Sequence, residues 1–164
     1  MIESLENLVN VLIFTVKELS SVLRYPEDVL VPIEGEPDYV RRAIIKTVWE
    51  GVKYPVCRLT YYHYWNEEFM YVFEPMYDEI EEVQKLSPYA FMGIPSIDID
   101  LKLDKYIRRN ITPAFIVSRT PPRNREDVRE LMESVGLDHY DAFEYLIRTN
   151  MRASQDKLIV EADE

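Results

Sequence analysis

The stretch that decides the fold of this chain is residues 54–73, with the sequence YPVCRLTYYHYWNEEFMYVF. Two segments rich in aromatic and β-branched residues, 54–64 and 69–73, flank the polar residues 65–68. Such residues favour strands, and a short polar segment between two of them is typical of a hairpin. The sequence therefore predicts a β-hairpin near the centre of the chain.

Helical spacing is found on both sides of this hairpin. After it, residues 75–86 place apolar side chains at Met76, Ile80 and Val83, which predicts an amphipathic helix. Before it, Pro37 and Asp38 precede a segment ending at Gly51, which predicts a helix over 38–48. Its apolar side would consist of Val40, Ile44, Ile45 and Val48.

The N-terminal segment has its own helical pattern. Seven apolar residues recur at intervals of three and four between Leu5 and Leu23, with Ser4 placed to cap a helix. Prolines and a glycine between 25 and 37 separate this segment from the rest. We therefore expect one domain over 1–164, with a helical extension at 1–36 and a core at 37–164. The wide apolar side of the extension predicts a homo-oligomer formed through it.

Further along, residues 97–104 alternate strictly between aliphatic and charged side chains, which predicts a strand or an extended segment on the sheet. Asp98, Asp100 and Asp104 would form a row on its polar side. A solvated polar face is the simpler interpretation of that row, and a divalent-cation site is the alternative.

The C-terminal part contains several short predicted elements. These are a helix over 114–118 begun by Thr112 and Pro113, one over 125–135 capped by Asn124 and ended by Gly136, one over 142–149 capped by Asp141, and a strand over 157–161. The predicted fold class is thus α+β, a small antiparallel sheet packed with several short helices and extended by the N-terminal helical segment.

Composition excludes several classes of protein. With one cysteine and two histidines, the 164 residues offer no internal disulfide and no closed zinc site without carboxylate help. Acidic residues follow Met1 where a secretory leader needs basic ones, and no apolar run reaches the ~20 residues of a membrane span. We therefore expect a cytoplasmic protein that binds no metal and does not contact a membrane.

No pattern of catalytic residues stands out. The four glycines form neither of the phosphate-binding loops, so no nucleotide cofactor is expected. Cys57 lies in a predicted strand, where a cysteine is usually a small buried apolar residue. His139 lies in a predicted loop beside a helix start, and no third group is placed to orient it. The sequence predicts no catalytic residue and a protein that is not an enzyme.

Charge is unevenly distributed along the chain. The net charge is −11, and nearly all of it falls within residues 1–100. The acidic cluster comprises seven residues within 67–82, namely Glu67, Glu68, Glu74, Asp78, Glu79, Glu81 and Glu82. Eight basic residues fall within 102–129, and five of them are candidate anion contacts, namely Arg108, Arg109, Arg119, Arg123 and Arg125.

Each charged set has two interpretations. The acidic cluster can bind a basic protein partner and even imitate the phosphates of a duplex, or it can simply keep a helix face in water. The basic strip can contact an anion, or its arginines can cap helices and pair with nearby acids. The net charge makes direct binding to nucleic acid an unfavourable interpretation.

The order of elements in residues 54–162 is defined by the segments 58–61, 71–75, 93–95, 114–122, Arg125, 136–137, 141–149 and Asp156. This order resembles the small amino-terminal subdomain of HipA-type toxin kinases, which also exists as a free-standing protein. The chain departs from the family in its extra N-terminal residues and at 149–151, where the family often has a small or glycine-rich turn.

The resemblance implies a regulatory module without kinase chemistry, because the catalytic residues of that family lie in a larger domain. Its partner would be a kinase-like toxin, a repressor or a defence protein. The alternative function is an acidic inhibitor from a phage or mobile element, which would block a host defence or DNA-binding protein by mimicking nucleic acid.

Overall fold

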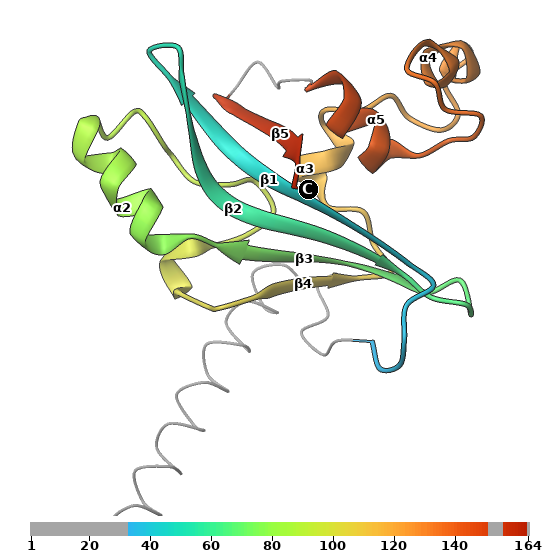
Figure 1. Ribbon diagram of the computed structural model, residues 1–164, viewed down its shortest axis with the longest axis horizontal. Coiled ribbons are helices and arrows are strands. Elements are labelled where there is room, and N and C mark those ends of the chain that lie inside the picture. The colour runs from blue at the N-terminus through green and yellow to red at the C-terminus, as the bar shows by residue number, and fades with distance from the viewer. Residues whose placement is uncertain (1–32, 151–155, 164) are drawn as a thin grey trace, which may run out of the picture.

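The expected α+β fold is confirmed in the computed structural model, which describes residues 33–150 and 156–163. The predicted helix over 5–23 and its self-association lie outside the described residues. One antiparallel sheet has the spatial order β4-β3-β2-β1-β5. Its strands are β1 (Tyr39–Trp49), β2 (Val52–His63), β3 (Phe69–Pro75), β4 (Tyr106–Arg109) and β5 (Leu158–Ala162), shown in Figure 1.

The central hairpin is confirmed. β2 and β3 pair in the antiparallel register that places Tyr61 opposite Tyr71 and His63 opposite Phe69. Glu67, in the turn, has a positive φ of 67°, a conformation that most side chains avoid. Pro55 lies in β2 beside a bulge in the pairing with β1, where its missing N–H interrupts no regular ladder.

The helix predicted over 38–48 is wrong, because these residues form β1, the strand between β2 and β5. Ala43, Ile45 and Thr47 alternate into the core, which is strand periodicity. Gly51 does not end a helix. It follows Glu50 in a two-residue hairpin turn in which both residues have positive φ, as the twist of a tight hairpin favours.

The described residues contain four short α-helices, which are α2 (Tyr77–Leu86), α3 (Ala114–Val117), α4 (Val128–Ser134) and α5 (Ala142–Thr149). α2 and α5 agree with the predicted segments. α3 begins after Pro113 without a side-chain cap, and α4 begins later than predicted, with Asp127 rather than Asn124 at its N-cap. Gly136 ends α4 as predicted, with a φ of 82° and its N–H donating to the carbonyl oxygen of Glu133.

The strand predicted over 97–104 is also wrong. Residues Ile99–Leu101 form a single 3₁₀ turn, which begins where the Asp98 carboxylate accepts a hydrogen bond from the N–H of Asp100. Lys102 then takes a left-handed conformation. Local bonding of an aspartate to the backbone competes with sheet pairing, so the alternating pattern lies in a loop.

The core lies on one face of the sheet, beneath the helices. All five strands contribute buried side chains to it, and so do α2, α3 and α5. The helical contributors include Ile80, Phe115, Phe143 and Leu146. None of the helices in the described ranges combines the length and hydropathy that a bilayer crossing requires.

Candidate functional site

Four of the seven predicted acidic residues share the outer surface of α2. Ile80 and Val83 turn this helix toward the core, so Asp78, Glu79, Glu81 and Glu82 are exposed. Lys85 is the basic residue of the last turn, and its ammonium lies 2.8 Å from the Glu82 carboxylate. Glu82 and then Glu81 raise the pKa of Lys85, as expected where acids outnumber bases.

The other three acids lie elsewhere, so the sequence cluster is divided in space. Glu67 and Glu68 lie at the hairpin end of β3, whereas α2 follows its other end. Seven residues of strand span roughly 20 Å. The Glu68 carboxylate lies 2.9 Å from the Arg109 guanidinium, which lowers the pKa of Glu68. Glu74, within β3, is half-buried.

The predicted basic strip does not form one surface either. Arg108 and Arg119 are buried, with 1% and 4% of their surface exposed, so they cannot contact an external anion from these positions. Arg109 is held by Glu68, and Arg125 pairs with Asp127. Arg123 stacks over the Tyr140 ring, with its guanidinium carbon 4.6 Å from the ring centroid. Most of these arginines therefore have structural partners.

From the last residue of α2 onward, the chain exposes three large apolar side chains that sequence reasoning missed. Leu86, Tyr89 and Met92 are 55%, 65% and 79% exposed. Between them, Ala90 and Phe91 are buried, so the loop is fixed to the core while its neighbours point outward. The only sign of this exposed surface in the sequence was the run of four apolar residues 89–92 in a loop that also contains Pro88 and Pro95.

A pocket of about 820 Å³ lies beside these exposed side chains. Apolar residues of the loop 88–97 line it together with Gln84 and Leu158, and Asp98, Asp100 and Lys157 lie at its edge. We use the name docking surface for four residues that line this pocket and three residues of α2, namely Tyr89, Met92, Asp98 and Asp100 with Glu79, Glu82 and Leu86.

A second hollow lies over the other end of the sheet. This groove, of about 1090 Å³, has an aromatic floor made by Tyr39, Tyr61, Phe69 and Tyr71. The rings of Tyr61 and Tyr71 lie 5.0 Å apart between centroids, a contact distance that fixes both side chains. His63 and His139, the two histidines of the sequence, both line the groove.

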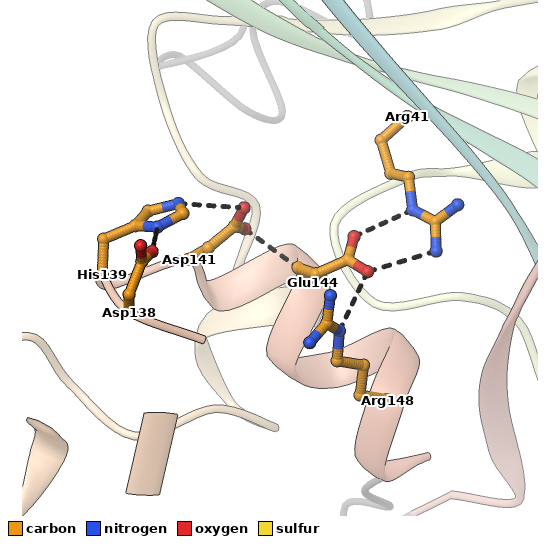
Figure 2. A network of polar contacts seen from close by, with 6 residues as sticks. All are labelled: Arg41, Asp138, His139, Asp141, Glu144 and Arg148. Carbon is orange, nitrogen blue, oxygen red and sulfur yellow. Dashed lines mark hydrogen bonds and ion pairs between the residues drawn. The ribbon is translucent and has the colours of Figure 1, made fainter. Parts of the chain in front are cut away.

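An arginine–glutamate–arginine cluster forms one wall of the groove (Figure 2). Both oxygens of Glu144 on α5 accept bonds from Arg41 on β1, at 2.8 and 3.2 Å. Arg148, one turn later on α5, donates to the same carboxylate at 3.2 Å. The cluster therefore ties α5 to the sheet and leaves little of the Glu144 charge for a ligand.

The tyrosine hydroxyls of the groove are weak acids. Burial, and after it the carboxylates of Asp141 and Asp38, raise the pKa of Tyr61 to about 12. The pKa of Tyr71 is raised as well, first by burial and then by Tyr61 and Asp141. These hydroxyls stay protonated near neutral pH and act as hydrogen-bond donors rather than nucleophiles.

The other residues considered for a catalytic or metal-binding role, Cys57, Asp98 and Asp100, lie in positions where they stabilise the fold. Cys57 is fully buried, and burial raises the pKa of its thiol. Asp98 and Asp100 belong to the 3₁₀ turn rather than to a strand row. Within residues 33–150 and 156–163, no group of three His, Cys, Asp or Glu side chains is arranged to hold a metal ion.

Asp141 is expected to stabilise α5 as its N-cap. Its carboxylate accepts the N–H of Glu144 at 3.0 Å, so Asp141→Ala should lower the free energy of unfolding by about 1 kcal/mol. Asp138→Ala is the matched control, because that carboxylate is 97% exposed and contacts only its neighbour His139 among the described ion pairs. Urea denaturation followed by circular dichroism would test this, and equal midpoints for the two variants would contradict it.

His63 gives the protein a pH-dependent contact. Its Nδ1 lies 2.8 Å from the Asp38 carboxylate, and this hydrogen bond is the main reason why the pKa of His63 is raised. Because the folded pKa exceeds the unfolded value, the stabilisation is fully present below the unfolded pKa and disappears as pH rises through the folded one.

We expect the His63 ring protons to titrate by NMR above the ordinary histidine midpoint of about 6.5, and Asp38→Asn to lower that midpoint. The stability advantage over His63→Gln should decrease as pH rises. A midpoint at or below the ordinary value would contradict the assignment.

No protein-family model matches the chain, and comparisons with curated proteins and with solved structures found no significant match.

Proposed function

We propose that the protein is a non-catalytic regulator that works by binding another protein, as the resemblance to the HipA-type subdomain implies. The observation that carries the proposal is the exposure of Leu86, Tyr89 and Met92 at the end of an acidic helix. Single exposed apolar residues are common, but three along one short segment are typical of a protein-binding surface. The partner we favour is a kinase-like toxin, a repressor or a defence protein.

The fixed geometry of the loop supports a binding role. The Thr47 hydroxyl donates to the carbonyl oxygen of Ala90 at 2.6 Å, and Ala90 itself is fully buried. Tyr89 and Met92 therefore keep their outward positions in the unbound protein, so that binding loses little conformational entropy.

Affinity capture from the native host tests this function, with the whole chain as bait. We expect a stoichiometric protein that is retained by the wild type and lost with Tyr89→Ser/Met92→Ser. Trp65→Ser is the matched control, because Trp65 is 81% exposed in the distant β2–β3 turn. Failure to recover a stoichiometric partner, or equal recovery by both variants, would refute the proposal.

The four exposed carboxylates of α2 favour a second candidate, an inhibitor that mimics nucleic acid. Mimicry predicts that changing Asp78, Glu79, Glu81 and Glu82 to lysine abolishes binding of a basic partner, while Tyr89→Ser/Met92→Ser leaves it intact. A protein-docking regulator requires the apolar side chains as well. The two variants therefore separate the candidates.

A further inference from the structure

We infer that the docking surface accepts a basic amphipathic segment of the partner, with an apolar side chain of that segment in the pocket beside α2. This inference rests on the proposed function and specifies the chemistry of the contact. Three observations support it: the exposed apolar side chains of the surface, the acidic residues around them, and the pocket.

The pocket can bind an apolar side chain of the partner. Pro88, Phe91, Ile94 and Ile97 are among its lining residues, and Tyr89 and Met92 stand at its exposed edge. A volume of about 820 Å³ accommodates one or two large side chains. Anchors of this kind, seated in a preformed pocket, supply most of the free energy of many protein interfaces.

The charges around the pocket specify the rest of the occupant. Residues of α2 and the pocket lining include seven acidic side chains, one of which, Asp156, is paired with the buried Arg119. The other six stand against two basic ones, Lys85 and Lys157, a difference of −4. Lys157 lies 3.9 Å from the centroid of the Trp49 ring, and Lys85 pairs with Glu82. A partner with Lys or Arg beside its apolar anchor complements this arrangement, whereas an acidic partner would be repelled.

Helical geometry places acid and apolar groups on the same side of α2. Glu79, Glu82 and Leu86 follow one another at intervals of three and four residues, so they share one side of α2, which ends at Leu86. An amphipathic helix lying across the C-terminal end of α2 would place its apolar face on Leu86, Tyr89 and Met92 and its basic residues near the acids of α2.

The test uses the whole protein and synthetic peptides of about 18 residues, roughly five helical turns. The probe has leucine on one face and lysine on the other. One control replaces every lysine by glutamate, and another replaces every leucine by serine. By fluorescence anisotropy we expect binding of the Leu/Lys peptide alone, weakened by added salt.

Substitutions in this protein then test whether the peptide binds at the docking surface. Tyr89→Ser/Met92→Ser and Glu79→Lys/Glu82→Lys should each weaken binding of the Leu/Lys peptide by about tenfold or more, about 1.4 kcal/mol. Glu130→Lys/Glu133→Lys makes the same charge change on exposed residues of α4 and should have a much smaller effect.

The inference would be overturned by absent binding, by equal binding of the Leu/Glu or Ser/Lys peptide, or by equal effects of the two charge reversals. A native partner captured through Tyr89 and Met92 would still support the proposed function in those cases, so the two failures are distinguishable.

Discussion

Replacing Asp156 by asparagine is expected to lower the free energy of unfolding by about 3 kcal/mol, the cost of leaving a buried charge without its counterion. The charge in question is Arg119, whose side chain is fully buried and pairs with the Asp156 carboxylate. The guanidinium also donates to the carbonyl oxygen of Phe115 at 3.0 Å and stacks on the Phe115 ring. Neither contact neutralises it.

The substitution is chosen to keep the rest of the site intact. The Oδ1 atom of Asp156 accepts the N–H of Leu158 at the start of β5, and asparagine retains an oxygen for that bond. The effect of Asp156→Asn is therefore assigned to the lost pairing with Arg119, which loses both the negative charge and the Oδ2 acceptor. Asp127→Asn is the control, because the Arg125–Asp127 pair is about half exposed and solvent replaces the lost contact.

An asymmetry between the two partners provides a sharper test. Arg119→Met should cost less than Asp156→Asn, because the Asp156 side chain remains 20% exposed and can be hydrated. The double variant should then be more stable than Asp156→Asn alone. Denaturation in guanidinium chloride would measure all four proteins, and a double variant less stable than Asp156→Asn would contradict the assignment of a buried unpaired charge.

Arg119 also illustrates what the sequence could and could not predict. Its position in a basic strip suggested an anion contact, because composition gives the number of charges but not their partners. Asp156 is 37 residues away along the chain. Only the pairing of β5 with β1 brings it to the end of α3, and such long-range packing has no local signature.

The fold was predictable where local signals agreed. The β2–β3 hairpin has strand-forming residues around a polar turn, and α5 has an aspartate cap at Asp141 and a left-handed Asn150 at its end. Residue propensities, the spacing of apolar residues and the turn or capping residues indicate the same structure in both cases, and both predictions are confirmed.

β1 failed because periodicity and propensity disagreed. Its apolar residues fit a helical stripe, but Val40, Ile44, Ile45, Thr47 and Val48 are β-branched, which favours strands. β1 is hydrogen-bonded to β2 on one side and to β5 on the other. These partner strands stabilise the extended conformation over the helical one. β1 also carries Val40, Ile44 and Val48 on the face opposite Ala43 and Ile45, and these apolar residues obscure the alternation that identifies a half-buried strand.

The candidate site was predictable only in its charges. The acids of α2 were evident from the sequence, but their separation from Glu67 and Glu68 follows from the length of β3, and the outward positions of Tyr89 and Met92 follow from the burial of Ala90 and Phe91. An apolar residue in a loop has no pattern that reports its exposure, since burial depends on which distant elements cover it.

Glu144→Gln is expected to lower the free energy of unfolding by about 2 kcal/mol, because one substitution removes the charged acceptor of two arginines. Glu144 itself is only 12% exposed on its side chain. Arg41 is 24% exposed, so water replaces its bonds only in part. The substitution weakens the Arg41–Glu144 contact, which joins α5 to β1 beside the aromatic groove.

Glu133→Gln is the matched control for this prediction. Glu133 on α4 also pairs with an arginine four residues away, Arg129, but both side chains are exposed, at 59% and 90%. The spacing of four residues and the charge change are the same, whereas burial, the second arginine and the order of acid and base along the helix differ. Exposed pairs contribute little, so thermal unfolding should shift clearly for Glu144→Gln and hardly for Glu133→Gln. If both shifts were equal, Glu144 would form only an ordinary surface ion pair, and α5 would be held to the sheet by its apolar side chains Phe143, Leu146 and Ile147.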